Sequence, residues 1–333
     1  MNATTAIILV NWNGWRNTIE CMQSLQSLDH PAFAVVLVDN ASTDESMAKI
    51  QKWLASQAAA PKSFCTHSFI HQKAISAFAA PLRHRSVSLV QSASNNGFAA
   101  GNNLGLRIAL QARCDYMWLL NNDTVVDPHA LTALENCMQR DRTIGMVGSV
   151  LRYYDQPDII QAVGGVQFNF WRSRGTQIGQ GLNVNNADIP ALAKQPLSYV
   201  AGASMLVSMS FLNDVGLMYE GYFLYFEEIE WASRACPKWT MAIASTSVVF
   251  HKEGGAIGTS SRASRSLMAQ YYLTRNSLAF FRQHKPALLP IALVNSVYEG
   301  IKQALTGEWE LASCTFSAIR RGLAGEMGAM SVR

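Results

Sequence analysis

In the first 150 residues, short uninterrupted apolar runs alternate with segments of helical periodicity. An apolar run bounded by turn residues is typical of a strand that is buried on both faces of a parallel sheet. Apolar positions spaced three and four residues apart predict the helices that cover such a sheet. The pattern therefore predicts an α/β fold with an open, doubly wound, Rossmann-like sheet. The expected strands are residues 6–10, 33–38, 87–90, 116–120 and 144–150. The expected helices occupy residues 19–28, 42–53 and 98–110, and a fourth begins at Pro128.

Beyond residue 150 the pattern is less regular. Glycine and aromatic residues fill residues 163–171, which predicts antiparallel strands, whereas residues 175–196 are predicted to form a polar loop. Residues 56–86 contain two prolines and three histidines and are predicted to form an irregular insertion. Helical periodicity returns over residues 263–282. A further apolar, partly amphipathic region extends to about residue 323, so we expect a helical C-terminal extension.

No segment is predicted to cross a membrane. The first 14 residues contain a short apolar run without a preceding basic region, which indicates a strand rather than a signal peptide. The longest late apolar run, residues 286–294, is far shorter than the ~20 residues that a membrane span requires. The six cysteines are scattered and form no CxxC pair, which favours free thiols in a reducing, cytoplasmic compartment.

The net charge of +4 is unevenly distributed along the chain. Residues 262–333 contain nine Lys and Arg against four Asp and Glu, which leaves 18 basic and 19 acidic residues in the remainder. A nucleic-acid-binding protein would have a denser basic face with aromatic readers, so we expect no nucleic-acid partner. The basic, apolar C-terminal quarter suits a peripheral contact with an anionic membrane surface, a homodimer contact or plain core packing.

Polar clusters follow four of the expected strands. They are residues 11–14 (Asn-Trp-Asn-Gly), 39–42 (Asp-Asn-Ala-Ser), 95–97 (Asn-Asn-Gly) and 121–123 (Asn-Asn-Asp). Ligands of open α/β sheets bind beyond the carboxyl ends of the strands, where these clusters would converge. Asn, Asp and Gly also form ordinary turns, which explains any one cluster by itself. Four clusters at one edge favour a binding site.

The chain lacks the usual phosphate-binding loops. No GxGxxG motif follows the first strand and no GxxxxGK[ST] motif occurs, so neither a dinucleotide site nor a P-loop is expected. A bound diphosphate would then need another source of positive charge. A divalent metal is the simplest source, because Mg²⁺ is held by one or two carboxylates together with phosphate oxygens and water. Asp123 is the natural ligand at the end of its strand.

Glu227, Glu228 and Glu230 follow an aromatic run, residues 222–226, and precede Trp231. Carboxylates close to one another and to aromatic surface have raised pKa values, which suits a general base that takes a proton from a sugar hydroxyl. The alternative is a solvated helix N-terminus, where acidic residues are favoured by the helix dipole.

Two further residues are candidates for the site. His251 ends an apolar strand and precedes a glycine-containing loop, although a lone histidine is more often structural. Arg275 lies on the expected late helix, where it either reaches a phosphate or has an ordinary surface or capping role.

Six ordered motifs resemble those of the family 2 glycosyltransferases with the GT-A fold, and within them the bacterial rhamnosyltransferase-like members. The motifs are VNWNG (10–14), VDNASTD (38–44), NNGFAAGNN (95–103), LLNNDT (119–124), FLYFEEIEW (223–231) and VFH (249–251). The resemblance covers residues 6 to about 282. It implies a GT-A catalytic domain over residues 1–260, with a nucleotide-sugar half to about residue 125 and an acceptor half from 126. Residues 261–333 would be the helical C-terminal region.

The resemblance also implies the site residues. Glu228 would be the catalytic base and Glu227 a positioning or acceptor-binding residue. Asp123 and His251 would hold Mg²⁺ or Mn²⁺. Asp39 would contact the base or ribose of the donor. The remaining nucleotide-sugar contacts would be Asn11, Asn13, Asn95, Gly97, Asn102 and Asn122. Arg275 is added to these contacts from its place on the late helix, not from the resemblance. Two positions depart from the family pattern: the DxD motif is Asn121-Asn122-Asp123, and the Glu-Asp pair is Glu227-Glu228.

The function implied by the resemblance is inverting transfer of a hexosyl group, with rhamnose from dTDP-rhamnose as the leading candidate. The acceptor would be a hydroxyl of a glycan or lipid-linked molecule in bacterial surface polysaccharide synthesis, at the inner face of the plasma membrane. A nucleotidyltransferase is the enzymatic rival, but residues 11–14 do not supply its Gly-rich basic loop. The other rival is a non-catalytic nucleotide-sugar-binding or scaffold protein of the same fold.

Overall fold

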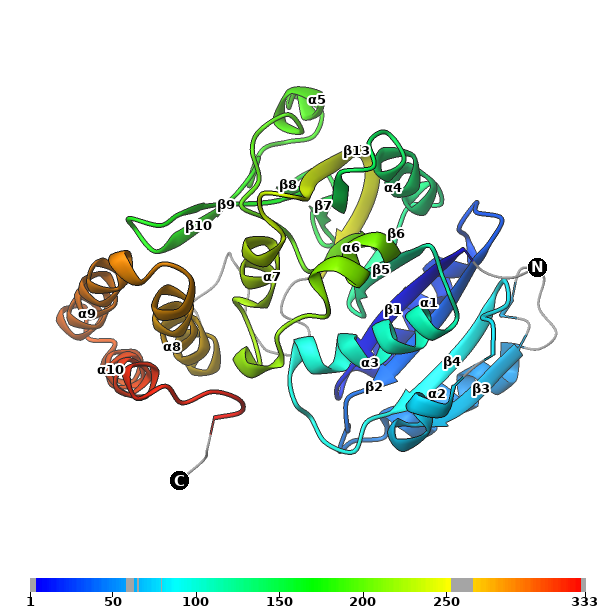
Figure 1. Ribbon diagram of the computed structural model, residues 1–333, viewed down its shortest axis with the longest axis horizontal. Coiled ribbons are helices and arrows are strands. Elements are labelled where there is room, and N and C mark those ends of the chain that lie inside the picture. Colours follow the sequence, from blue (N-terminus) through cyan, green and yellow to red (C-terminus); the bar gives the residue numbers. More distant parts are fainter. Residues whose placement is uncertain (1–3, 58–62, 65, 79, 253–265, 331–333) are drawn as a thin grey trace.

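The computed structural model describes residues 4–57, 63–64, 66–78, 80–252 and 266–330. Its central feature is a ten-stranded mixed sheet, with strand order β3-β4-β2-β1-β5-β12-β7-β13-β6 and with β8 paired to β7 (Figure 1). In that order the strands are β3 (Thr66–His71), β4 (Ser86–Gln91), β2 (Phe33–Asp39), β1 (Thr5–Asn11), β5 (Tyr116–Asn121), β12 (Ser204–Ser208), β7 (Ile144–Tyr153), β13 (Thr240–His251), β6 (Thr124–Val126) and β8 (Ile160–Val163).

The first five strands of this order are parallel, and antiparallel pairing begins at β12. Because β12 runs against β5, the beginning of β12 lies beside the end of β5. A small second sheet joins β10 (Arg174–Gln177), β9 (Gly165–Asn169) and β11 (Tyr199–Val200). The predicted α/β class, its open sheet with mixed later strands and its helical C-terminal region are thus confirmed.

Helices cover both faces of the sheet because alternate strand residues point to opposite sides. Ile7 and Leu9 of β1 pack on one face with α1 (Trp15–Gln26), α2 (Ser46–Ser56) and α4 (Ala130–Met138). Ala6 and Ile8 pack on the other face with α3 (Phe98–Gln111), α6 (Met209–Val215) and α7 (Glu227–Ala235). A Cβ at Gly101 or Gly105 would overlap Val10 or Ile8, so these glycines let α3 lie directly on β1.

The C-terminal helices are α8 (Leu267–His284), α9 (Leu289–Leu305) and α10 (Trp309–Ala324), and they form a lobe at one end of the molecule (Figure 1). Their core is continuous with that of the preceding domain, because Tyr222, Phe226 and Ile229 share one cluster with Leu278 and Phe280. The division of the chain at residue 260 therefore stays a prediction. None of the described helices is both long and apolar enough to cross a membrane.

Two local predictions were wrong, and the start of a third element is only partly described. The expected irregular insertion over residues 56–86 contains the edge strand β3 and the 3-10 helix η2 (Gln72–Ala77). The polar residues of β3 do not match the apolar pattern expected of a buried strand, since an edge strand need not be apolar throughout. The polar loop over residues 175–196 contains most of β10 and the short helix α5 (Ile189–Leu192). The helix expected from residue 263 is α8, which begins at Leu267, while residues 263–265 lie outside the described ranges.

The predicted start of the second helix, at a capping box formed by residues 42–45, was also wrong, because α2 begins at Ser46. The Ser42 hydroxyl instead donates to Asp39 Oδ1 at 2.6 Å and accepts from the Asn13 backbone N–H at 2.9 Å. Asp44 accepts the Ser46 N–H at 2.9 Å in its place. Ser42 thus belongs to a polar network at the strand ends.

The candidate active site

The ends of β1 and β2 are joined by buried polar side chains. Asn11 and Asp39 are both fully buried, and Asn11 Nδ2 donates to Asp39 Oδ1 at 2.8 Å. The Asp39 carboxylate also accepts the backbone N–H of Ser42 at 3.0 Å. A buried carboxylate needs such donors, and three of them hold the Asp39 side chain in one orientation. The two residues predicted to contact the nucleoside therefore lie together.

The end of β5 is connected to the same network. Asn122 Nδ2 donates to Thr18 Oγ1 at 2.8 Å, and Thr18 Oγ1 donates to Asn11 Oδ1 at 2.7 Å. A chain of hydrogen bonds thus runs from β5 through α1 and β1 to β2. The convergence of these strand ends, which the sequence pattern predicted, is present in the structure.

The loop that follows β4 joins from the other side. Asn40 Nδ2 donates to Asn95 Oδ1 at 2.9 Å and to the Gly97 carbonyl at 3.1 Å. Asn13 bridges the loops after β1 and β2, since its Oδ1 accepts the Thr43 N–H at 2.8 Å. Asn13, Asn95 and Gly97 therefore lie on loops at the same edge as Asp39.

Asp123 and His251 are brought together by the antiparallel pairing of β6 and β13, in which His251 lies opposite Thr124. His251 Nε2 lies 3.2 Å from Asp123 Oδ1, and both side chains are nearly buried. His251 Nδ1 lies 2.9 Å from Gln161 Oε1. If Nδ1–H donates to that carbonyl oxygen, the Nε2 lone pair faces the carboxylate, an arrangement that suits a cation bound by both groups.

These two groups fit a divalent metal that completes its coordination with substrate oxygens and water. Among the described residues no group of three or more His, Cys, Asp or Glu side chains could hold a metal ion. Among the described residues, Asp123 and His251 are the pair that would hold such an ion. A carboxylate and an imidazole in this arrangement suit either Mg²⁺ or Mn²⁺.

The acidic cluster begins α7. Burial raises the pKa of Glu228 to about 7. Burial, followed by the charge of Glu228, raises the pKa of Glu227 well above its ordinary value. Glu227 Oε2 is buried and has no hydrogen-bond partner among the described residues. Glu230 differs from both, because it forms an ion pair with Arg234 at 2.7 Å. Only the first two glutamates are available for chemistry.

Glu228 lies beside Gly202, just before β12. A Cβ on Gly202 would overlap the Glu228 carboxylate, and its three nearest atoms would all belong to that side chain. The next residue, Ala203, accepts the Asn121 backbone N–H at 3.0 Å. Because Asn121 ends β5 two residues before Asp123, Glu228 and Asp123 lie at the same edge of the sheet.

The loop before the glutamates also contacts the loop after β4, which contains the predicted donor contacts Asn95 and Gly97. The Phe98 N–H at the start of α3 donates to the Phe223 carbonyl at 2.8 Å. Gly97 has a φ of +94°, and a Cβ there would overlap the Phe223 backbone. Gly97 therefore allows the loop after β4 to meet the loop before α7.

Two predicted donor contacts are placed inside the protein. The Asn102 amide donates to the Phe98 carbonyl of its own helix at 3.0 Å, and its side chain is buried. Arg275 is only 1% exposed, and its guanidinium donates to the carbonyls of Tyr222 at 2.8 Å and Gly328 at 2.7 Å. We therefore assign Arg275 to holding the Tyr222 loop rather than to a phosphate.

Several residues of the site were missed by the sequence reasoning. They are Thr18, Asn40, Ser42, Gln161, Gly202 and Asn276. Asn40 and Ser42 belong to a motif that was noted, so their positions carried a signal. Gln161 and Gly202 lie in segments with no local pattern, and only the tertiary contact reveals them.

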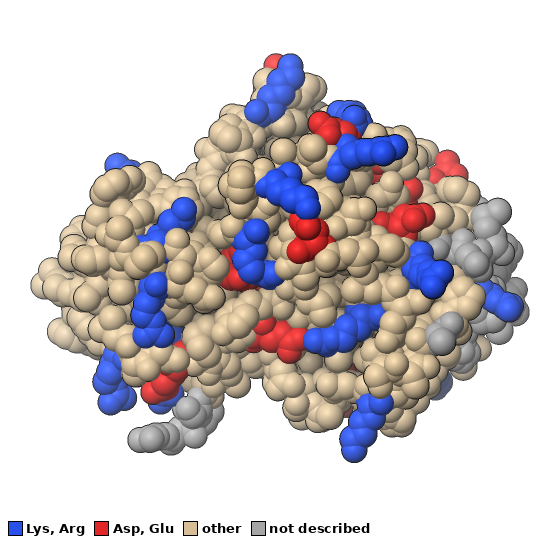
Figure 2. Space-filling view, in the orientation of Figure 1, with Lys and Arg blue, Asp and Glu red and all other residues tan. Residues whose placement is uncertain are grey.

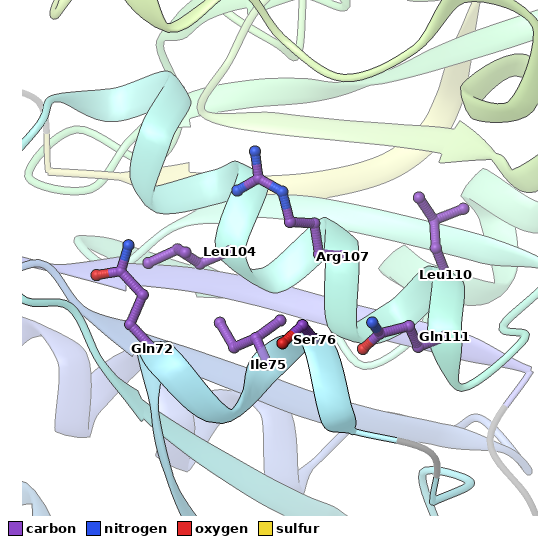
Figure 3. A pocket seen from close by; sticks show the side chains of 7 residues that line it. All are labelled: Gln72, Ile75, Ser76, Leu104, Arg107, Leu110 and Gln111. Atoms are coloured by element: carbon purple, nitrogen blue, oxygen red, sulfur yellow. The ribbon is translucent and has the colours of Figure 1, made fainter.

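Two cavities in the described part of the chain lie away from the network at the strand ends. One of about 440 Å³ opens between η2 and α3, where Gln72, Ile75 and Arg107 contribute to its wall (Figure 3). None of its lining residues is a predicted site residue. A second, of about 520 Å³, lies between α8 and the C-terminal segment and is lined by Arg275, Arg320 and Arg321.

Comparison with known proteins supports the same family that the motifs indicate. The sequence model of "Glycosyl transferase family 2" matches residues 71–215. This segment contains Asn95, Gly97 and residues 121–123 but neither Asp39 nor the two glutamates. The chain is also 23% identical over 236 residues to the low-salt glycan biosynthesis hexosyltransferase Agl10 of Haloferax volcanii, covering 69% of this chain and 61% of that protein. It thus spans about three fifths of that relative.

A solved structure shares the fold. The mannosyltransferase PcManGT from Pyrobaculum calidifontis, in complex with GDP-Man and Mn²⁺, aligns with a TM-score of 0.54 and 14% identity over 97% of this chain and 88% of that chain. S. aureus TarS 1–349 in complex with UDP-GlcNAc aligns with a TM-score of 0.49 and 12% identity over 97% and 92% of the two chains. The first alignment confirms the predicted fold. The family model, matched over residues 71–215, confirms the predicted resemblance to family 2.

Proposed function

We propose that this chain, whose residues 71–215 match the model of glycosyl transferase family 2, is an inverting hexosyltransferase that uses a nucleoside-diphosphate sugar. One observation carries the proposal. A glutamate with a pKa raised to about 7, Glu228, lies at the same sheet edge as the Asp39 network and the Asp123–His251 pair. That edge is where open α/β sheets bind their ligands.

Each residue has a role in this reaction. The Asp39 network binds the nucleoside, and Asp123 with His251 would hold Mg²⁺ or Mn²⁺, which when bound neutralises charge on the diphosphate. Glu228 accepts the proton of the acceptor hydroxyl. The acceptor oxygen bonds to the anomeric carbon from the face opposite the leaving group, as the bond from that carbon to the diphosphate oxygen breaks. The electron pair leaves with the nucleoside diphosphate, and the configuration inverts.

Similarity to known proteins narrows the range of candidate sugar donors. Agl10 is described as a hexosyltransferase, and PcManGT was solved with GDP-Man and Mn²⁺. Both support a hexose donor, and the second supports a divalent metal. We propose rhamnose from dTDP-rhamnose as the donor, on the resemblance of the six motifs alone, and a glycan or lipid-linked hydroxyl in surface polysaccharide synthesis as the acceptor.

The C-terminal lobe supports a peripheral membrane contact at the cytoplasmic face. Val294, Tyr298, Ile301 and Leu305 of α9 are between 48% and 84% exposed and recur at helical spacing. The outermost part of this lobe, at the left of Figure 2, is largely free of charged side chains in that view. Lys302 of α9 is exposed beside this stripe, and such a cation near an anionic surface contributes about 1 kcal/mol.

The test is thermal stabilisation by a panel of nucleotide-sugars, with and without Mg²⁺ or Mn²⁺, followed by transfer assays with the best donor. Glu228→Gln keeps the shape of the side chain but cannot accept the proton. We expect it to bind the donor as the wild type does, with turnover at least about a hundredfold lower. Unchanged turnover would exclude Glu228 as the base. Donor binding without transfer in the wild type would favour a non-catalytic nucleotide-sugar-binding protein.

A further inference from the structure

The loop that leads into the catalytic glutamates has a strained backbone. Phe223, Tyr225 and Phe226 have φ values of +69°, +65° and +76°. Left-handed conformations are costly for bulky side chains and persist only where the surroundings enforce them. Phe226 directly precedes Glu227, so its conformation sets the direction in which α7 begins and where the two carboxylates point.

A single side chain from α8 satisfies this loop. Asn276 Nδ2 donates to the carbonyls of Leu224 at 2.7 Å, Tyr222 at 3.0 Å and Tyr225 at 3.0 Å. Asn276 is fully buried. The left-handed residues turn these three carbonyls toward one point, so removing the amide would take a buried hydrogen bond from each of them.

Arg275 completes the clamp. Its Nε donates to Asn276 Oδ1 at 2.9 Å, which orients the amide so that its N–H groups face the loop. Its Nη2 donates to the Tyr222 carbonyl at 2.8 Å. The loop is held on its other side by the Phe98 N–H, which donates to the Phe223 carbonyl at 2.8 Å. The loop thus spans the gap between α8 and the start of α3.

We propose that Asn276 is a positioning residue for the reaction: through the Tyr222–Phe226 loop it sets the place of Glu227 and Glu228. This inference rests on the proposed function for its catalytic consequence. The clamp itself can be tested without activity.

Asn276→Asp tests the clamp, because aspartate has the same shape but presents oxygen instead of N–H groups to the three carbonyls. Gln270→Ala is the matched control. Gln270 is equally buried on α8 and donates to Thr274 and Thr315, away from the loop. Both variants lose buried hydrogen bonds, but only the first disturbs residues 222–226. Asn276→Ser, which keeps one O–H donor, is the fallback if the aspartate variant does not fold.

The first readout is limited chymotrypsin digestion with the cleavage sites mapped by mass spectrometry, since residues 222–226 are consecutive chymotrypsin sites. We expect cleavage there to be about tenfold faster in Asn276→Asp or Asn276→Ser, as expected for the loss of a hydrogen bond of ordinary strength, and unchanged in Gln270→Ala. Equal protection of the loop in the wild type and the Asn276 variants would overturn the clamp, whatever the activity.

The second readout is kinetic. In the Asn276 variants we expect kcat to fall about a hundredfold, with a KM for the donor close to that of the wild type. The acidic limb of the pH–rate profile should move to lower pH, because a loosened loop admits water to Glu228. Gln270→Ala should keep the wild-type profile. A loosened loop with unchanged kcat and profile would overturn the positioning role, whereas a wild type that transfers nothing would count against the proposed function alone.

Discussion

At the scale of single residues, the proposed chemistry depends on one carboxyl group, that of Glu228, which is kept partly out of water. Burial raises the pKa of Glu228 to about 7. An acid whose pKa is raised on folding stabilises the protein fully below its unfolded value of 4.5, and this contribution is lost as the pH rises through about 7. The ionised form of Glu228, which a general base requires, therefore lowers the stability of the folded protein.

Replacing Glu228 by glutamine removes that ionisation. We expect Glu228→Gln to raise the melting temperature relative to the wild type at pH 8, where the native glutamate is forced to ionise, and to leave it nearly unchanged at pH 4.5. Calorimetry across this range measures the difference. An equal effect at both pH values would mean that Glu228 is not titrating inside the protein.

Gly202 offers an independent test of the same carboxylate. Its φ lies outside the left-handed range, so the backbone accepts alanine, and the three atoms nearest the added Cβ would belong to the Glu228 side chain. We expect Gly202→Ala to displace the carboxylate and to lower kcat by about a hundredfold with donor affinity retained. Turnover and calorimetric donor binding give the two values. A wild-type kcat in a folded variant would show that the carboxylate need not lie against residue 202.

At the scale of elements, the site exists because strands far apart in sequence end at one edge. β5 and β13 are separated by more than a hundred residues, yet β6 and β13 pair so that His251 meets Asp123. The sequence pattern predicted most of these strands, since apolar runs are recognised locally. It missed β3 because an edge strand with polar residues has no clear local pattern. It misplaced the start of α2 because Ser42 bonds to Asp39 across the fold instead of capping the helix.

The Asp123–His251 pair, at the ends of β5 and β13, leads to a prediction about metal binding. We expect the best nucleotide-sugar to stabilise the wild type more with Mn²⁺ than with EDTA, and this increment to be absent in Asp123→Asn and His251→Ala. Asp127→Asn, on the same segment but bonded only to the His129 N–H in its described contacts, is the control. Thermal shift assays measure it. An undiminished increment in both site variants would place the metal elsewhere.

At the scale of the whole molecule, the catalytic edge and the apolar stripe of α9 belong to one body. α8 holds the loop before Glu227 through Asn276, while α9 packs beside α8 and presents the stripe outward (Figure 1). A protein anchored through α9 would keep its active site at a constant position relative to the surface that carries a lipid-linked acceptor.

This arrangement predicts binding to vesicles that contain anionic lipid. Leu305 is 84% exposed, and we expect Leu305→Glu to weaken sedimentation with such vesicles while leaving folding intact. Phe69→Glu, at an exposed position on edge strand β3 at the opposite end, is the control and should bind as the wild type does. If Leu305→Glu changed the oligomeric state in ultracentrifugation and not vesicle binding, the stripe would be a contact between two copies.

The sequence by itself determined the α/β class, most of the strands and the polar residues at their ends, because the periodicity of burial and the chemistry of turns are local properties. It also supplied the motifs that indicated family 2. Only the tertiary structure decided what each polar residue does. The Ser42 hydroxyl bonds to Asp39 instead of capping a helix, and the Arg275 guanidinium bonds to the Tyr222 carbonyl inside the protein. Asn276 bonds to the loop before the glutamates, and Gly202 lies against the Glu228 carboxylate. These outcomes depend on which donors and acceptors meet across the fold, and contacts between residues dozens of positions apart have no local signature.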